Sequence, residues 1–413
     1  MKKQRYGTIY VAVLGMSLLV TVIALGAVAA VRANARSRDR GNDVEDARFY
    51  ALSGIELARL RITQDPNWRT DFTNGPWITS QSIGTGTVSV TGVNPNGTLA
   101  NSELDPVNLT ATGTKGIASQ MIKVTLVSQP VALGCLGVAV DSASDALIKN
   151  ATVRGTGAFS SGGAMNVQKT SLNGNALEGI TVIVDNKSSG AGPASILATP
   201  RATPTAAVFN YYTQHGTVIS YSSIPGGNIQ NVVLSSTSNP YGAATDPNGV
   251  YVIDCGGGTI TVQSCRLVGT LVLLNVGSSS KIGQSVNLAP MVANYPTLLI
   301  QGSVQLNVAA SVLDEATAGN LNPPGTPYNG VSNSTATDTY PSVIKGLVYV
   351  SGNVIENNNT TLVGCLVIGG TLNVGQNFTI NYDPTFANNP PPGFVVTPPP
   401  MVISPGTWSQ GVN

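Results

Sequence analysis

The amino-acid sequence predicts a mainly β protein with one long N-terminal α-helix, in which a small antiparallel sheet precedes a right-handed parallel β-helix. Three observations support this fold class. An uncharged run from Thr8 to Val31 continues into a helix-compatible segment that ends near Pro66. The remaining chain consists of short β-branched runs separated by Gly, Asn, Ser and Thr, which favour turns. Two of these runs align at an offset of 18 residues. A β-sandwich with long loops is the alternative fold.

These features divide the 413 residues into six segments. The predicted segments are a leader at 1–7, a transmembrane helix at 8–31, an amphipathic extension of that helix at 32–65, a small antiparallel β-sheet domain at 66–130, a parallel β-helix-like domain at 131–386 and a Pro-rich C-terminal tail at 387–413.

The apolar run from Thr8 to Val31 has the length of a membrane span. Its 24 residues form a helix of about 36 Å, enough to cross the hydrocarbon core of a bilayer. A cleaved signal peptide is the alternative, because Ala33-Asn34-Ala35 has the small-residue pattern of a cleavage site. Basic residues lie on both sides of the run, so charge alone leaves the orientation open. The sparsely charged, Gly-, Asn- and Thr-rich remainder favours a body outside the cytoplasm.

The segment after the span has the periodicity of an amphipathic helix. Apolar residues recur at spacings of three and four at Val44, Ala47, Ala51, Ile55, Ala58 and Ile62. Charged side chains occupy much of the remaining surface. Pro66 disfavours helix at the preceding residue and ends the segment. We expect the apolar stripe to pack on the sheet that follows.

Four strands are predicted in that sheet. They lie at Trp77–Thr79, Thr87–Thr91, Val107–Thr112 and Gln120–Val127. The second and fourth alternate apolar and polar residues, which indicates a sheet with one covered face.

A weak repeat predicts the β-helix. Gly346–Val354 aligns with Gly364–Leu372, Leu299–Leu306 fits the second half of this pattern, and Gly134–Val140 fits its first half. Coils of this length bury their inward side chains only against neighbouring coils. Two long insertions, Pro200–Gly227 and Leu313–Pro341, interrupt the predicted coils.

The charged and metal-binding residues exclude several functions. The last 314 residues carry 10 basic and 13 acidic side chains, too sparse for a nucleic-acid surface. The chain has one histidine, His215, and four cysteines without a CxxC, so we expect no metal or other cofactor. The acidic pairs Asp314–Glu315 and Asp141/Asp145 are interpreted as solvated turn residues. No catalytic residue is predicted.

The cysteines allow one structural prediction. Outside the cytoplasm Cys255 and Cys265 are positioned to form a disulfide if they lie on neighbouring strands. The alternative is that each thiol is a small buried apolar group.

The N-terminal segment resembles that of type IV pilin-like proteins. It has a short basic leader ending in Gly7, an apolar helix, and the alanine-rich extension Ala47-Arg48-Phe49-Tyr50-Ala51-Leu52-Ser53-Gly54-Ile55-Glu56-Leu57-Ala58. It is most similar to PilX-type minor pilins and to the tip pseudopilins of type II secretion. The resemblance implies cleavage by a prepilin peptidase between Gly7 and Thr8. The family's glutamate at the fifth mature position is absent here, where Ala12 stands, as in tip-type members.

This resemblance implies a membrane-anchored, non-enzymatic structural or assembly protein of the bacterial envelope, a minor pilin or pseudopilin that presents its β-helical body for adhesion or assembly. The implied location is the inner membrane, crossed once, with the body in the periplasm or on the cell surface. Expected partners are the lipid bilayer, other pilin-like subunits through the N-terminal helix, and surface polysaccharide, but not nucleic acid. The alternatives are an anchored carbohydrate-binding or polysaccharide-degrading β-helix protein and a surface adhesin without a pilus connection.

Overall fold

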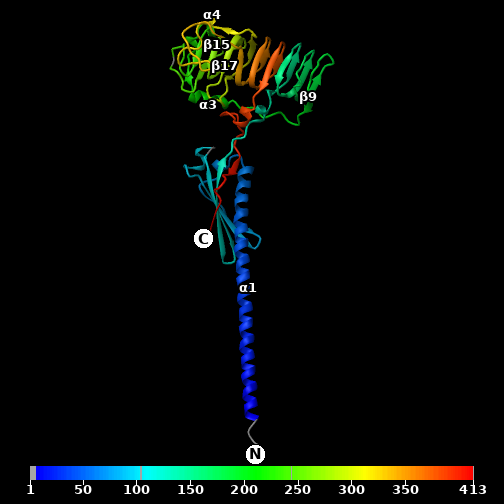
Figure 1. Cartoon of the computed structure of the whole chain (residues 1–413), viewed down its shortest axis with the longest axis vertical. Helices are drawn as coiled ribbons and strands as arrows, with labels where there is room; N and C mark the ends of the chain where they lie inside the picture. The colour runs from blue at the N-terminus through cyan, green and yellow to red at the C-terminus, as the bar shows by residue number, and fades with distance from the viewer. Residues whose placement is uncertain (1–5, 103–104, 243, 413) are drawn as a thin grey trace, which may run out of the picture. The chain divides into compact units, whose positions relative to one another are not determined.

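One α-helix, α1 (Tyr6–Gln64), forms the N-terminal part of the computed structural model of this chain (Figure 1). The structure describes residues 6–102, 105–242 and 244–412, so positions 1–5 of the predicted leader lie outside the described residues. The helix runs from the apolar segment into the charged one and ends two residues before Pro66, as predicted.

The chain folds as two units. The helix-and-sheet unit comprises Met1–Gln129 and Thr397–Asn413, and the coiled unit comprises Pro130–Val396. The chain therefore passes from the first unit into the second and returns at its C-terminal end.

The helix-and-sheet unit holds an antiparallel sheet in the order β1-β2-β3-β4-β27, with β28 also on β4. Its elements after α1 are α2 (Trp68–Asp71), β1 (Gly75–Ile83), β2 (Gly86–Val93), η1 (Leu99–Asn101), β3 (Val107–Lys115), β4 (Ala118–Ser128), β27 (Met401–Ile403) and β28 (Ser409–Val412). The four predicted strands are present, each longer than the sequence indicated.

The Pro-rich C-terminal tail contains two strands of this sheet. Its last 17 residues belong to the helix-and-sheet unit, where β27 and β28 both pair with β4. Triplets of proline discourage a strand assignment from sequence, but the pairing residues lie after the prolines, where backbone N–H groups are available.

The coiled unit is built from short strands. Its elements are η2 (Gly134–Gly137), β5 (Val140–Ser142), β6 (Ala146–Lys149), β7 (Val153–Thr156), β8 (Phe159–Gln168), β9 (Leu177–Val184), β10 (Ala194–Ile196), α3 (Val208–His215), β11 (Thr217–Val218), η3 (Tyr221–Ser223), η4 (Pro225–Gly227), β12 (Asn228–Gln230), β13 (Val233–Ser235), β14 (Val250–Asp254), β15 (Thr261–Val268), β16 (Thr270–Leu274), β17 (Lys281–Ala289), β18 (Leu298–Ile300), β19 (Val304–Val308), β20 (Leu313–Asp314), α4 (Glu315–Ala318), β21 (Thr339–Tyr340), β22 (Val343–Val350), β23 (Val354–Glu356), β24 (Thr360–Ile368), β25 (Leu372–Val374), β26 (Phe378–Tyr382) and α5 (Thr385–Asn388).

These strands form three parallel ladders around one apolar core. The first runs β11-β14-β16-β18-β22-β24-β5-β8-β9-β10, the second β12-β15-β17-β19-β23-β25-β6-β8-β9, and the third β13-β15-β17-β22-β24-β26-β7. Long strands such as β24 turn a corner and contribute to two ladders. The predicted class, a long helix with a small antiparallel sheet and a large parallel one, is confirmed. A β-sandwich would have required antiparallel ladders.

The repeat read from the sequence corresponds to strand register. Gly346 pairs with Gly364 and Val354 with Leu372, which is the predicted offset of 18 residues. Gly302, Gly352 and Gly370 stack, each accepting an amide N–H from the next along this column. The alignment of Gly134–Val140 was wrong, because most of this stretch forms η2 outside the ladders.

The turns of the coil do not follow chain order (Figure 1). The chain begins in the middle at β5 and winds to one end at β10. It then restarts at the other end with β11 and winds back to β26, which pairs with β7. The segment 198–216 is therefore a link between the two ends rather than an insertion into one coil. Its helix α3 buries Val208, Phe209 and Tyr212 against the outer side chains of the first ladder.

The second predicted insertion is folded around two buried charges. Glu315 is 1% exposed and accepts hydrogen bonds from the Tyr340 hydroxyl at 2.6 Å and the Leu321 amide at 2.7 Å. Arg266 donates to the Leu321 carbonyl at 2.8 Å. The prediction that Glu315 is solvated was wrong, because these contacts bury it, whereas Asp314 caps α4 through the Ala316 amide as a turn residue does.

Candidate membrane anchor and assembly surface

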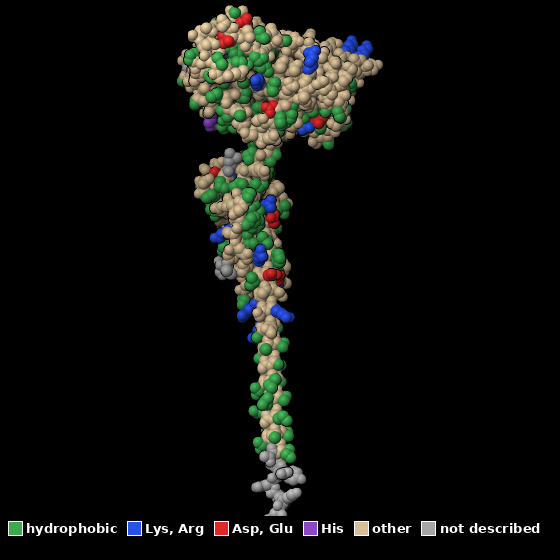
Figure 2. Space-filling model, viewed as in Figure 1, with side chains coloured by type: hydrophobic (Ala, Val, Ile, Leu, Met, Phe, Trp, Pro, Cys, Tyr) green, Lys and Arg blue, Asp and Glu red, His purple; other side chains and the backbone are tan. Residues whose placement is uncertain are grey.

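The first half of α1 is an apolar surface that the described chain leaves uncovered. From Ile9 to Val31 its large side chains are 50–75% exposed, and no residue of its most apolar stretch is buried. The helix is long and apolar enough to cross a membrane, and Figure 2 shows green side chains along this half with charged ones beginning beyond it. An exposed apolar helix of this length matches a single-pass anchor.

A double substitution at the middle of the span tests this assignment. Replacing Leu19 and Ile23 with arginine adds about 5–7 kcal/mol to the cost of insertion, from about 2.5–3.5 kcal/mol for each arginine. We expect the variant to leave the carbonate-resistant membrane fraction. Ser37→Arg, on the same helix beyond the span, is the control and is expected to remain there. Equal retention of both variants would contradict membrane insertion.

The second half of α1 packs against the sheet through small and branched side chains. Ala47, Ala51, Ile55 and Ala58 are fully buried, and Ile62 is 7% exposed. This is the predicted stripe without its first member, since Val44 is 42% exposed.

Glycines bring the helix close to the sheet. A Cβ atom on Gly113 of β3 would overlap the Ala47 carbonyl oxygen and the Ala51 amide of α1. On the helix side, a Cβ on Gly54 would lie 2.5 Å from a Val88 methyl group. Both positions therefore require glycine for close approach.

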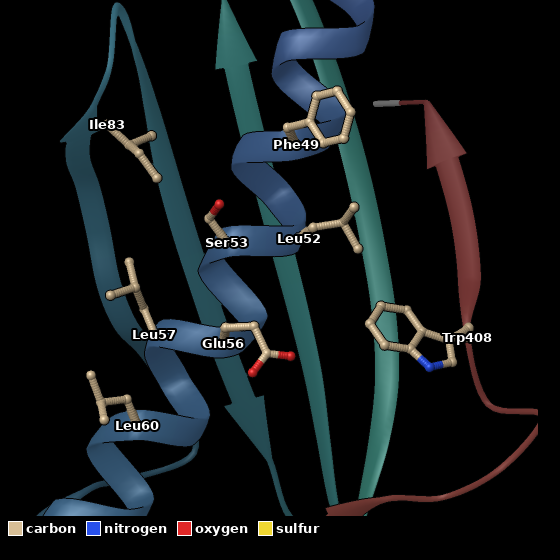
Figure 3. Close-up of a pocket in the computed structure, with 8 residues that line it drawn as sticks. All are labelled: Phe49, Leu52, Ser53, Glu56, Leu57, Leu60, Ile83 and Trp408. Carbon is tan, nitrogen blue, oxygen red and sulfur yellow. The ribbon is translucent and has the colours of Figure 1, made fainter.

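The opposite face of the same helical segment carries an apolar groove of about 480 Å³ (Figure 3). Its lining residues are Phe49, Leu52, Ser53, Glu56, Leu57, Leu60, Ile83 and Trp408. Figure 3 shows Trp408 on the Leu52 side of the helix and Ile83 on the Leu57 side. Phe49 is 59% exposed, Leu60 50% and Trp408 48%. The groove is thus a shallow surface with large apolar side chains at both ends.

The charges in the groove are paired locally. Arg59 donates to Glu56 at 2.9 Å one helical turn away. Such an exposed pair adds little stability, but it leaves the groove without a free carboxylate. This face was predicted to be charged, but apolar residues are interleaved with the charged ones. Their spacing from Phe49 to Leu52 and from Leu57 to Leu60 was the available signal.

The predicted processing site lies at the beginning of α1. Gly7 and Thr8 both have helical backbone, and their side chains are outside what the structure describes. Cleavage between them remains a prediction.

Cys255 and Cys265 are free, buried thiols of the coiled unit. Cys255 follows β14, which pairs with β11 and β16, whereas Cys265 lies in β15, which pairs with β12, β13 and β17. They therefore do not lie on paired strands. Burial raises the pKa of Cys255 to about 11 and that of Cys265 to about 12, which keeps both thiols protonated. A disulfide between them remains a prediction.

The other residues weighed for chemistry are dispersed over the coiled unit. His215 ends α3, stacks on Tyr211 at 4.4 Å and contacts the Tyr211 carbonyl through Nδ1 at 2.7 Å. Asp145 accepts a hydrogen bond from the Ala164 amide at 2.8 Å, as a turn residue does. Asp141 is 1% exposed, contrary to the prediction of a solvated side chain, because it lies on β5 beside Ser160 and near Arg201 and Glu178. Within the described ranges, no three His, Cys, Asp or Glu side chains are grouped to hold a metal.

Comparison with known proteins adds little to this description. No protein-family model matches the chain. No curated protein matches it either. Among solved structures, the competence-associated pilin ComZ from Thermus thermophilus is similar over 90% of this chain and 98% of its own, with 12% sequence identity and a TM-score of 0.36. At that TM-score the likeness supports no inference, so the function rests on the surfaces of α1.

Proposed function

We propose that this chain is a membrane-anchored, pilin-like structural subunit of the bacterial envelope that joins other subunits through α1. One observation carries the proposal. A single unbroken helix presents, in series, an uncovered apolar half, a stripe buried on its own sheet, and an outward apolar groove on the same segment as that stripe. The first surface suits lipid, the second fixes the helix to its unit, and the third is free to contact another helix.

The shape of the groove favours a helix as its binding partner over a small molecule. It is shallow and runs along about three turns of α1, from Phe49 to Leu60. Side chains spaced three and four residues apart on one face are the anchors that a second amphipathic helix contacts. Because the groove follows the apolar half along one helix, a partner anchored in the same membrane would reach it without a change of direction.

The finer role is a minor pilin or tip pseudopilin without enzymatic activity, processed between Gly7 and Thr8. The absence of an acidic side chain at Ala12 supports a capping role over a repeating filament subunit, by the resemblance of the N-terminal segment. The proposed location is the inner membrane, with the coiled unit in the periplasm or on the cell surface, where it would serve adhesion or assembly.

Photo-crosslinking from the groove tests this function. A benzoylphenylalanine placed at Leu60 in the full chain is expected to yield adducts with the N-terminal helix of another pilin-like subunit in native membranes. Adding Phe49→Asp should reduce the yield about tenfold, because a carboxylate buried against an apolar helix costs at least about 1.4 kcal/mol.

The same photo-reactive residue at Val218, an apolar position 64% exposed on the coiled unit, is the control. It should give no such adduct. If adducts from position 60 are absent, or come only from proteins without an apolar N-terminal helix, the proposed function is wrong.

A further inference from the structure

The two ends of the coil differ in how their cores are covered. At the β11–β13 end, the inward side chains Ile219, Ile224, Ile229 and Leu234 are at most 3% exposed. Tyr221 and Tyr241 pack against that end of the core. The chain therefore supplies its own cover there, as terminal repeats of solenoid proteins do.

No segment among the residues that the structure describes in the coiled unit gives such a cover to the β9–β10 end, called the open end here. Ile196 lies in the inward-facing column in register with Gly179, Ser161, Ser142 and Ile368, yet it is 67% exposed. Val184 continues the column of Val167 and Ile148 and is 39% exposed. Figure 1 shows β9 in the last turn at this end. Core-facing side chains thus meet solvent.

The strand edges at the open end are long and weakly protected. β10 pairs only with β9, and all three of its residues are exposed. β10 covers only Leu177–Gly179 of β9, so the edge of β9 from Ile180 to Val184 is also unpaired on that side. Edge strands are normally guarded by charges, proline or short length. In the last turn, residues 177–197, the charged side chains are Glu178, Asp185 and Lys187, Pro193 is the one proline, and β10 itself contains no charge.

We propose that the open end is covered by the open end of a second copy of this chain, which makes a two-fold symmetric dimer of the coiled units. A second coil is the occupant that presents several strand edges around the same perimeter at once. Charge also favours it. Glu178 is paired with Arg201 at 2.6 Å, which leaves Asp185 and Lys187 in the last turn, two residues apart and opposite in sign.

In a two-fold arrangement a residue of one copy faces a different residue of the other, and the reverse contact follows by symmetry. Asp185 of each copy can then lie beside Lys187 of the other. A head-to-tail filament is excluded by the same structure, because the opposite end is already covered. The assembly therefore closes at two copies.

The mass of the full chain in detergent, measured by sedimentation with the detergent matched in density, tests this proposal. The wild-type protein is expected to be a dimer. Ile196→Lys should raise the dissociation constant about tenfold or more, because it buries an unpaired charge at the interface. The control is Val218→Lys, which places the same charge at an equally exposed apolar residue of the covered end and should leave the dimer intact.

A second measurement distinguishes this dimer from contacts made through α1. Zero-length crosslinking of mixed isotope-labelled copies should join Asp185 of one copy to Lys187 of the other. Phe49→Asp, which weakens the helix groove, should not change that yield. A monomeric wild type, equal effects of the two lysine variants, or a dimer lost only through Phe49→Asp would each overturn the proposal.

Discussion

Replacing Gly113 with alanine is expected to separate the second half of α1 from its sheet. The added Cβ would overlap the backbone of Ala47 and Ala51, so no side-chain rotation relieves the clash and the helix must move away. Overpacking of this kind costs about 1–3 kcal/mol, and we expect the upper end because both overlapping atoms belong to the main chain. The unfolding free energy of the helix-and-sheet unit, followed by thermal unfolding of the full chain in detergent, should fall by about 3 kcal/mol.

Gly41→Ala is the matched control for this substitution. Gly41 lies in the same helix, and a Cβ atom added there would have no neighbouring atom within 4 Å, so alanine meets open space. The substitution should stabilise α1 by about 0.5–1 kcal/mol, since glycine is unfavourable inside a helix. If Gly113→Ala and Gly41→Ala gave the same change, the close packing of α1 on β3 would be refuted.

Replacing Glu356 with glutamine is expected to stabilise the coiled unit at high pH. Glu356 is 1% exposed in the core of the second ladder, and its Oε1 accepts the Asn358 amide at 3.1 Å. Burial raises the pKa of this carboxyl from 4.5 to about 7. The folded protein therefore holds the proton over a range in which the unfolded chain releases it, and the unfolding free energy falls as pH rises from about 4.5 to about 7.

Each unit of pKa corresponds to about 1.4 kcal/mol, so the ionised Glu356 side chain costs up to about 3 kcal/mol at pH 8. Glutamine keeps the amide-accepting oxygen and removes the charge. We expect the unfolding free energy of the variant, measured by chemical denaturation, to exceed that of the wild type by most of this amount at pH 8 and by little at pH 4. Glu45→Gln makes the same change of charge on an exposed side chain of α1 and controls for net charge. A gain independent of pH would contradict burial of the ionised carboxyl.

Asp141 also lowers the unfolding free energy as pH rises, and it does so equally in the wild type and in the Glu356→Gln variant. Burial raises the pKa of its carboxyl from 3.8 to about 6. The difference between the Glu356→Gln variant and the wild type therefore isolates Glu356, whereas the wild-type profile alone does not.

The sequence contained enough to predict the local elements of this fold. The apolar run, the stripe from Ala47 to Ile62 and the glycine-bounded repeat can each be recognised within a continuous stretch of sequence, from its composition or its periodicity. The offset between Gly346 and Gly364 became strand register because successive coils of equal length place equivalent residues side by side.

Features that depend on distant segments could not be predicted in this way. The pairing of β27 and β28 with β4 joins residues about 280 positions apart, and no local pattern marks it. The order of turns in the coil is set by where β26 meets β7, which is likewise a long-range contact. Glu315 has the local sequence of an exposed acidic loop residue. Only the folded chain brings Arg266 and Tyr340 to its loop, where they contribute to its burial. The helix side of the groove had a local signal in the spacing of its apolar residues, but Trp408, which closes one side, comes from the opposite end of the chain.

The N-terminus of the mature protein distinguishes a retained membrane anchor from a removed signal. The protein should be isolated from membranes that resist carbonate extraction, and its intact mass measured. We predict a chain that begins at Thr8 and keeps the whole of the described apolar half of α1. A soluble chain beginning near Arg36 would contradict the account, because the apolar half would then be a removed signal rather than the anchor of a pilin-like subunit.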